Sequence, residues 1–153
     1  NLDPIGKIHT PYKRDRDAPF QAYKSKDIGK IEVSKNYEEG LDDLEGFSHL
    51  ILLYEFHKPV KKSVKENCSL ESYGLRVKPY LDKKTHGVFA TRSPARPNPI
   101  GLSVVKLLER KENVLKVKGV DILDGTPLLD IKPYVPKFDR NDETRIGWIE
   151  GHL

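Results

Sequence analysis

Two segments carry most of the residues whose types and spacing could do chemistry. The first runs from Gly87 to Ser103 and holds two arginines, Arg92 and Arg96, together with three prolines between residues 94 and 99. Proline fixes φ and lacks a backbone donor, so we predict a stiff loop. A stiff loop would hold the two guanidinium groups near fixed positions, ready for a carboxylate or a phosphate. The alternative is a proline-rich connection whose arginines point into water.

The second segment, Asp121 to Tyr134, alternates acidic and apolar residues around Asp124-Gly125-Thr126-Pro127. These four residues predict a tight turn whose amides and hydroxyl could contact a ligand, although hairpins use the same residues for purely structural reasons. Two further candidates are His57, just after a strongly apolar run, and Gln21, the sole glutamine. A glutamine amide can pair with an adenine edge, but it can equally be incidental surface.

Several kinds of site are missing from the sequence. No Gly-x-Gly occurs, which excludes the Rossmann fingerprint, and no Gly-x-x-x-x-Gly-Lys-Ser/Thr offers a phosphate loop. The five histidines are too far apart in sequence to form a local metal-binding pair, and Cys68 is the one cysteine. We therefore predict no disulfide and no metal.

The composition is that of a globular domain with a highly charged surface. The chain has 153 residues, of which 37% are apolar and 33% charged, with a net charge of +4. We predict a single domain over residues 1–153 in the cytoplasm, because the longest apolar stretch, 50–54, is far shorter than the roughly 20 residues that span a bilayer. Acidic residues gather at 38–45 and basic ones at 58–96, so a polyanion such as RNA is a possible partner, although such blocks are often only solvated faces.

The elements that must position these residues are mostly strands. Alternating or continuous apolar patterns predict strands at 29–34, 49–56, 73–78, 102–109, 114–120 and 128–131, the fourth and fifth forming a hairpin. Helical spacing appears at 38–44, and a second turn is expected near 139–145. The fold class predicted is mainly β: a barrel or sandwich with one or two short helices.

Six segments between Ile5 and Pro136 together resemble the TsaA-like family, the TrmO (YaeB-type) group of S-adenosylmethionine-dependent tRNA methyltransferases. They are Ile5-Gly6-x-Ile8-x-Thr10-Pro11-Tyr12, Pro19-x-Gln21, residues 44–50, Phe56-His57, residues 87–101 and residues 123–134. The long motif at 91–101 is the most specific of them.

The resemblance implies a small β-barrel that binds S-adenosylmethionine, forms a homodimer and methylates N6 of threonylcarbamoyladenosine beside the tRNA anticodon. By position, the implied cofactor-contacting residues are Pro19, Phe20, Gln21, His57, Lys58, Arg92, Leu102, Asp124, Gly125, Thr126 and Pro127. Phe20 stands where the family commonly has arginine, which puts a charged contact there in doubt. Within this set, Arg92 or Lys58 could hold a carboxylate, the Asp124 turn could face positive groups, and Gln21 could meet the adenine.

The chemistry implied needs no nucleophilic residue, only a proton acceptor for the adenine nitrogen. His57, Asp124 and Asp130 are the candidates. Bacterial members carry an added C-terminal domain, whereas this chain ends at Leu153, so we expect no such domain and expect Arg96, Lys61 and Lys62 to contact RNA. Two alternatives stay open: a module that binds S-adenosylmethionine without methylating RNA, and a methyltransferase with another substrate.

Overall fold

The computed structural model of the chain describes residues 2–13, 26–57, 75–79 and 81–153. The chain divides into two compact units. The first comprises residues 1–57 and 100–139, and the second comprises residues 58–99 and 140–153. The assignment of residues 1–153 to one S-adenosylmethionine-binding domain stays a prediction.

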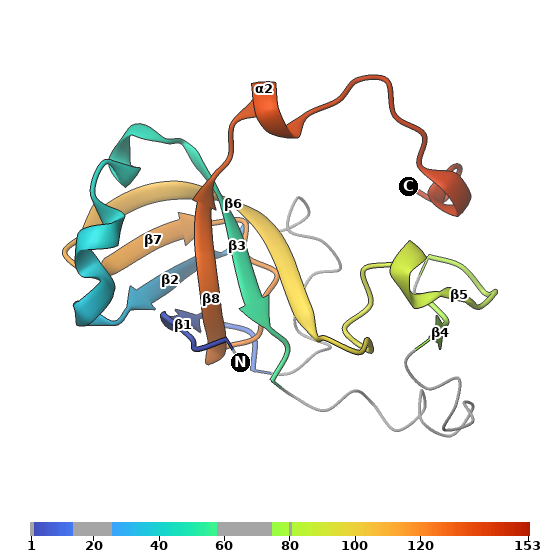
Figure 1. Cartoon of the computed structure of the whole chain (residues 1–153), viewed down its shortest axis with the longest axis horizontal. Coiled ribbons are helices and arrows are strands. Elements are labelled where there is room, and N and C mark those ends of the chain that lie inside the picture. Colours follow the sequence, from blue (N-terminus) through green and yellow to red (C-terminus); the bar gives the residue numbers. More distant parts are fainter. Residues whose placement is uncertain (1, 14–25, 58–74, 80) are drawn as a thin grey trace. The chain divides into compact units, whose positions relative to one another are not determined.

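The first unit is a closed antiparallel barrel, which confirms the mainly β prediction (Figure 1). In the described part of the chain, its strands follow the order β1-β2-β7-β6-β3-β8 around the barrel. Their bounds are Gly6–His9 for β1, Ile28–Val33 for β2, His49–Glu55 for β3, Ile100–Lys111 for β6, Val114–Lys118 for β7 and Thr126–Pro133 for β8. Closure leaves few unpaired strand edges, which a small open sheet would expose.

The barrel interior is built by the period-2 patterns in the sequence. In β2, Ile31 and Val33 are buried while Glu32 between them is exposed. In β3, Leu50 and Leu52 are fully buried. Because successive side chains of a strand point to opposite faces, each strand supplies every second residue to the core. The predicted hairpin is confirmed as β6 and β7, joined at Glu112 and Asn113.

The predicted helix at 38–44 is wrong in type and extent. The structure has two 3₁₀ turns instead, η3 at Lys35–Leu41 and η4 at Leu44–Gly46. Asp43 between them has a φ of 72°, a left-handed conformation that no right-handed helix continues through. Tyr37 is 44% exposed, so the apolar face expected from the spacing of Tyr37 and Leu41 does not form.

Two other boundaries differ from prediction. The turn expected at 139–145 is the short helix α2 at Pro136–Asp139, where proline suits a first helical turn and the Asp139 carboxylate accepts a hydrogen bond from the Val135 amide. β8 begins at Thr126 rather than 128, because residues 126–128 pair with β1 to close the barrel.

The second unit contains a two-stranded ladder of β4, Arg76–Val77, and β5, His86–Gly87. The strand predicted at 73–78 is therefore reduced to two residues within the part of that range that the structure describes, 75–78. Two 3₁₀ turns complete this unit, η5 at Val88–Ala90 and η6 at Gly147–Ile149. Across the described residues, no helix is long and apolar enough to cross a membrane, and the cytoplasmic location stays a prediction.

Candidate functional site

At one end of the barrel, the segment that follows β1 is joined to the segment that leads into β8. The Thr10 hydroxyl donates to the Ile122 carbonyl at 2.6 Å, and the Asp124 amide donates to the Tyr12 carbonyl at 2.7 Å. The Gly125 amide donates to the Ile8 carbonyl at 2.8 Å. We call these paired segments, residues 10–13 and 122–126, the barrel-end seam.

The carboxylate of Asp124 is the charged centre of the seam. Its Oδ1 accepts the Thr10 amide at 3.0 Å, and its Oδ2 lies 2.5 Å from the Lys13 Nζ. The hydrogen bond from Lys13, followed by the Thr10 amide and the charge of His9, holds the pKa of Asp124 below its usual range. Asp124 is therefore an ionised carboxylate, paired with Lys13 and 24% exposed at this end of the barrel.

The turn at 124–127 does not offer the exposed donors that the sequence led us to expect. The Asp124 and Gly125 amides serve the seam, and the Thr126 amide and hydroxyl both donate to the Leu123 carbonyl. The turn can therefore supply acceptors and negative charge to a ligand, rather than amide donors. Gly125 has a φ of 83°, which favours glycine, and a Cβ there would meet nothing within 4 Å, so space is open beside it.

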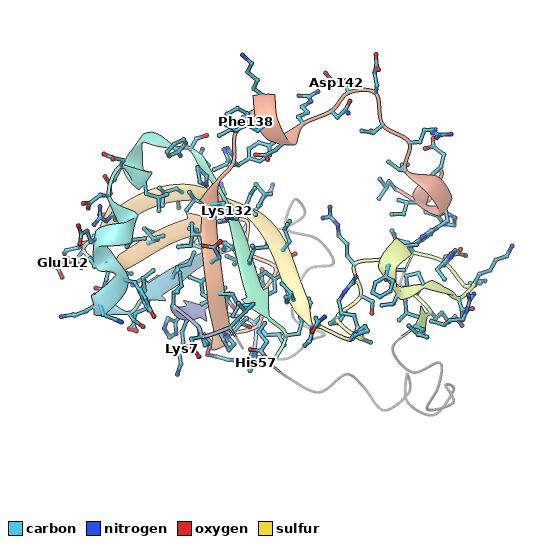
Figure 2. All side chains as sticks on the ribbon, in the orientation of Figure 1. Lys7, His57, Glu112, Lys132, Phe138 and Asp142 are labelled. Carbon is cyan, nitrogen blue, oxygen red and sulfur yellow. The ribbon has the colours of Figure 1, made fainter. Side chains whose placement is uncertain are left out.

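His57 approaches the same end of the barrel from β3 (Figure 2). Its Nδ1 lies 3.3 Å from the Thr126 hydroxyl oxygen. The Thr126 hydroxyl has one hydrogen, which it gives to the Leu123 carbonyl at 2.6 Å. The His57 Nδ1 must then be the donor, which assigns the lone pair of the neutral ring to Nε2. His57 is therefore oriented with a basic nitrogen away from Thr126.

A buried hydrogen-bonded chain supports the start of β6 near this site. The Tyr54 hydroxyl lies 2.9 Å from the Ser103 hydroxyl, which donates to Asp121 Oδ1 at 2.6 Å. The Tyr54 ring also covers Gly101, where an added Cβ would lie 2.3 Å from the ring carbon Cε2. Sequence reasoning missed this set of hydrogen bonds, because its members come from two strands, β3 and β6, and from the loop before β8.

The two arginines of the proline-rich loop in the second unit have different surroundings. Arg96 is half-buried, and its Nη1 donates to the carbonyls of Thr91 and Ser93 at 3.1 and 3.0 Å. Arg92 is exposed and has no hydrogen bond or ion pair with any residue that the structure describes. Arg96 thus braces its own loop, while Arg92 has its guanidinium available for an anion.

The C-terminal segment packs onto the same unit through Trp148. The indole stacks on the His86 ring with centroids 4.1 Å apart, and its Nε1 donates to the Ala90 carbonyl at 2.8 Å. His86 in turn donates from Nε2 to Asp82 Oδ2 at 2.8 Å. This hydrogen bond, with those from the Lys84 and Lys83 amides, lowers the pKa of Asp82 from its usual 3.8. Asp82 therefore holds the ring on which Trp148 stacks.

We expect the environment of Trp148 to change when Asp82 is protonated. A carboxyl whose pKa is lowered by folding stabilises the fold above its unfolded pKa, near 3.8, and loses that contribution as the pH falls through the lower folded value. Trp148 is the sole tryptophan, so its fluorescence during acid titration measures this unit directly. The signal should change below pH 3.8 and should already be altered at neutral pH in Asp82→Asn. Asp142→Asn, at a carboxylate 80% exposed, is the control; equal effects of both substitutions would contradict the assignment.

The structure brings together some of the predicted site residues and not others. His57, Asp124, Gly125, Thr126 and Pro127 gather at one barrel end. Leu102 lies on the outer face of β6, 46% exposed and opposite Leu53. Six predicted residues lie outside the described part of the chain: Pro19, Phe20, Gln21, Lys58, Lys61 and Lys62. Arg92 and Arg96 belong to the second unit.

Asp130 stands apart from the other proton-acceptor candidates. Its carboxylate accepts from the Ile131 amide and pairs with Lys132 at 3.1 Å, toward the other end of β8 (Figure 2). It also lines an open groove of about 510 Å³ with Tyr37 and other residues of η3. The residues that the structure describes include no cluster of three potential metal ligands, and the absence of a metal site stays a prediction.

The seam includes functional candidates that sequence reasoning missed. Thr10 lies in the quoted motif, but no role was predicted for it, and none was predicted for Lys13 or His9. The signal available was the polar Thr10-Pro11-Tyr12 directly after an apolar strand, since polar residues at strand ends commonly line sites. Their partner, Asp124, is more than a hundred residues away in sequence.

A six-stranded antiparallel barrel with an ionised carboxylate and an oriented imidazole at one end belongs to the class of small barrels that carry polar sites at their mouths. A family model for the tRNA-methyltransferase O N-terminal domain matches residues 7–140, and the chain belongs to that family. The resemblance predicted from the motifs is thereby confirmed.

Relatives of the chain carry two kinds of name. A probable S-adenosyl-L-methionine-binding protein of Pyrococcus abyssi is 57% identical over 98% of this chain and 76% of its own length. The tRNA (adenine(37)-N6)-methyltransferase of Escherichia coli is 38% identical over 88% of this chain and 57% of its own length. A crystal structure of TrmO from Pseudomonas aeruginosa aligns with a TM-score of 0.76 and 35% identity, over 97% of this chain and 62% of that one. The chain thus spans about three fifths of the latter two proteins.

Proposed function

We propose that this chain is an S-adenosylmethionine-dependent methyltransferase that modifies N6 of adenosine 37 in tRNA, in the threonylcarbamoylated form of that nucleoside. The observation that carries the proposal is the convergence of Asp124 and His57 at one end of a barrel of the tRNA-methyltransferase O family. Methyltransferases named for this reaction in Escherichia coli and mouse are both 38% identical to this chain. This sequence identity supports methyl transfer as the class of reaction, and the barrel end supplies side chains suited to that reaction.

The residues at the barrel end suit the cationic part of the cofactor. S-adenosylmethionine, when bound, supplies a methyl group already activated by a sulfonium. Asp124 stays ionised at neutral pH and is partly exposed, so it can face the positive groups of the ligand. The hydrogen-bond donors of the turn are bonded to backbone carbonyls, so the turn is better suited to a cationic group of a ligand than to an anionic one. In the second unit, Arg92 is suited to an anion such as a carboxylate, because its guanidinium has no partner among the described residues.

His57 is the best suited of the three candidates to accept the adenine proton. Its Nδ1 donates to Thr126, so the lone pair at Nε2 is the basic site. Asp124 is a weak base because Lys13 and Thr10 lower its pKa. Its proposed role is to orient the ligand by facing the ligand's positive groups with an ionised carboxylate. Asp130 is engaged by Lys132 at another part of β8. With an activated methyl donor, positioning can supply about 7 to 11 kcal/mol of the barrier.

The decisive experiment uses mass spectrometry of nucleosides. Threonylcarbamoylated tRNA is incubated with the protein and isotopically labelled S-adenosylmethionine, then digested to nucleosides. Label at N6 of the hypermodified adenosine is the expected result, and it should disappear with His57→Ala. Tight cofactor binding without any transfer would overturn the RNA methyltransferase proposal.

A second candidate is a module that binds S-adenosylmethionine without methylating RNA. The observation that favours it is the naming of the archaeal relatives: proteins that are 57%, 47%, 43% and 42% identical are named only for S-adenosylmethionine binding. A third candidate, transfer to another substrate, would give label in a small molecule or a protein instead of tRNA. The homodimer stays a prediction, which the sedimentation of the purified chain would test.

We expect Arg92→Ala to weaken S-adenosylmethionine binding while leaving the melting temperature unchanged. The side chain is exposed and makes no hydrogen bond or ion pair with the described residues, so we expect its removal to cost mainly the ligand contact. A charge-assisted hydrogen bond contributes about 1.5 to 3 kcal/mol, which predicts an affinity at least about tenfold lower by calorimetry. Arg96→Ala is the comparison, since losing its two loop contacts should lower the melting temperature. Equal losses of stability in both variants would contradict the placement of Arg92 in the binding site.

A further inference from the structure

One wall of the barrel carries lysines on three adjacent strands. Lys30 lies on β2, Lys116 and Lys118 on β7, and Lys106 on β6, and all four are exposed. β2, β7 and β6 are neighbours in the barrel, as Figure 1 shows. We call this surface the lysine face and define it by these four residues.

The strand register places the lysines directly opposite one another. Lys30 pairs with Lys116 across β2 and β7, and Lys118 pairs with Lys106 across β7 and β6. Directly opposed side chains of an antiparallel pair have Cβ atoms about 4.5 to 5.5 Å apart. Lys116 and Lys118 are two residues apart on one strand, so the two pairs are about 7 Å apart. Four positive charges therefore share a compact area of the barrel wall.

The residues that the structure describes do not hold these lysines in ion pairs. Within the described part of the chain, none of the four lysines forms an ion pair or a side-chain hydrogen bond. Glu109 is opposite Lys116 in the β6–β7 register, but their side chains form no ion pair. Like charges placed directly opposite across strands destabilise a sheet. Lys30–Lys116 and Lys118–Lys106 are two such pairs, and a polyanion bound to them would relieve their repulsion.

The lysine face continues into the barrel-end seam. His9 is opposite Lys30 in the β1–β2 register, and its Nδ1 lies 3.9 Å from Asp124 Oδ1. Lys118 is the last residue of β7, and five residues separate it from Asp124 in the chain. A polyanion on this wall would therefore extend to the end of the barrel where Asp124 and His57 lie.

We propose that the lysine face binds the phosphate backbone of tRNA and directs a nucleotide to the barrel end. This inference rests on the proposed function, which supplies tRNA as the polyanion. Phosphate contacts position a nucleic acid without reading its sequence, and lysine serves as a compact point charge for them. The surface belongs to the barrel, and none of its four lysines is among the RNA contacts predicted from the sequence, Arg96, Lys61 and Lys62.

The test measures tRNA binding by fluorescence anisotropy over a range of salt concentrations. The double variant Lys116→Gln/Lys118→Gln is compared with the wild-type chain and with Lys7→Gln/Lys132→Gln. The control removes the same charge from exposed positions on β1 and β8, where Lys7 is opposite Glu32 and Lys132 pairs with Asp130. Both variants keep the strand register, and melting temperatures confirm that each is folded.

We expect the lysine-face variant to bind tRNA at least about tenfold more weakly at low salt. Each phosphate contact contributes roughly 0.7 to 0.9 to the slope of log K against log salt, so two lost contacts should lower that slope by about 1.5. Its melting temperature should be unchanged or higher, because opposed like charges are removed. The control should lose much less affinity. Equal losses of affinity and slope in the two variants would overturn the proposal, as would selective loss of binding to anionic lipid vesicles with tRNA affinity retained.

Two readouts separate this proposal from the function on which it rests. If the wild-type chain binds tRNA through the lysine face but transfers no label, the surface stands and the methyltransferase proposal fails. If label is transferred at the wild-type rate by the lysine-face variant at limiting tRNA, the methyltransferase proposal stands and the lysine face is overturned.

Discussion

Asp124→Ala is expected to lower the free energy of unfolding by about 2 kcal/mol and the affinity for S-adenosylmethionine at least about tenfold. The substitution removes the acceptor of the Thr10 amide and the partner of Lys13. Thr10 is buried, so its amide would be left without a partner and without water. The seam that joins residues 10–13 to β8 would loosen, and the negative charge suited to the ligand would be lost. Chemical unfolding and calorimetry measure the two effects.

Two further variants isolate the cause of these effects. Asp124→Asn keeps an oxygen for the Thr10 amide and removes only the charge. The free energy of unfolding should therefore fall by less than the free energy of ligand binding. Asp130→Ala removes a carboxylate that is 48% exposed and whose partners among the described residues are its neighbours Ile131 and Lys132. We expect its free energy of unfolding to fall by less than about 1 kcal/mol. If Asp124→Ala lowered stability but left the affinity for S-adenosylmethionine unchanged, Asp124 would be a structural residue alone.

Gly6→Ala, which adds one methyl group to the barrel, is expected to destabilise it by about 3 kcal/mol. Gly6 pairs with Val33 where β1 joins β2. A Cβ at Gly6 would lie 2.2 Å from the Glu32 carbonyl oxygen and 2.9 Å from the Val33 Cα. Both are backbone atoms, which cannot rotate away as a side chain would. The β1–β2 ladder must separate to make room, and the barrel closure depends on it.

Gly40→Ala is the matched control, with the same chemical change in the same unit. Gly40 lies within η3, and a Cβ there would meet nothing within 4 Å. Alanine should cost nothing and should stabilise the chain by up to about 1 kcal/mol, because it restricts the unfolded state. Urea unfolding followed by circular dichroism compares the two. Similar stabilities for the two variants would show that β1 shifts freely against β2.

The local sequence pattern was sufficient to predict the strands in which apolar and polar residues alternate over several positions. β3 and the β6–β7 hairpin follow their predictions closely, because apolar periodicity and a polar turn are encoded by neighbouring residues. The helix predicted at 38–44 failed for an equally local reason, since Asp43 adopts a left-handed conformation that residue type alone did not reveal. The early start of β8 came from its pairing with β1, whose residues are remote in sequence.

Residue types in the sequence predicted only part of the candidate site. Asp124, Thr126 and His57 were named from motifs. The exposed donors expected of the turn bond internally instead, while its carboxylate, expected to face positive groups, is partly exposed. Thr10 and Lys13 were not named, because they meet Asp124 across more than a hundred residues of chain. The opposition of Lys30 to Lys116 likewise depends on strand register.

The order of amino acids was thus enough to establish a mainly β fold, the family, and the segments that hold its candidate residues. Those features depend on short-range periodicity and on motifs, which a linear reading preserves. Barrel closure added the seam around Asp124, the tautomer of His57 and the opposed lysines. These features could not be read in advance, because strand register and closure bring distant residues within hydrogen-bonding distance and thereby set both the pKa of Asp124 and the charge of the barrel wall.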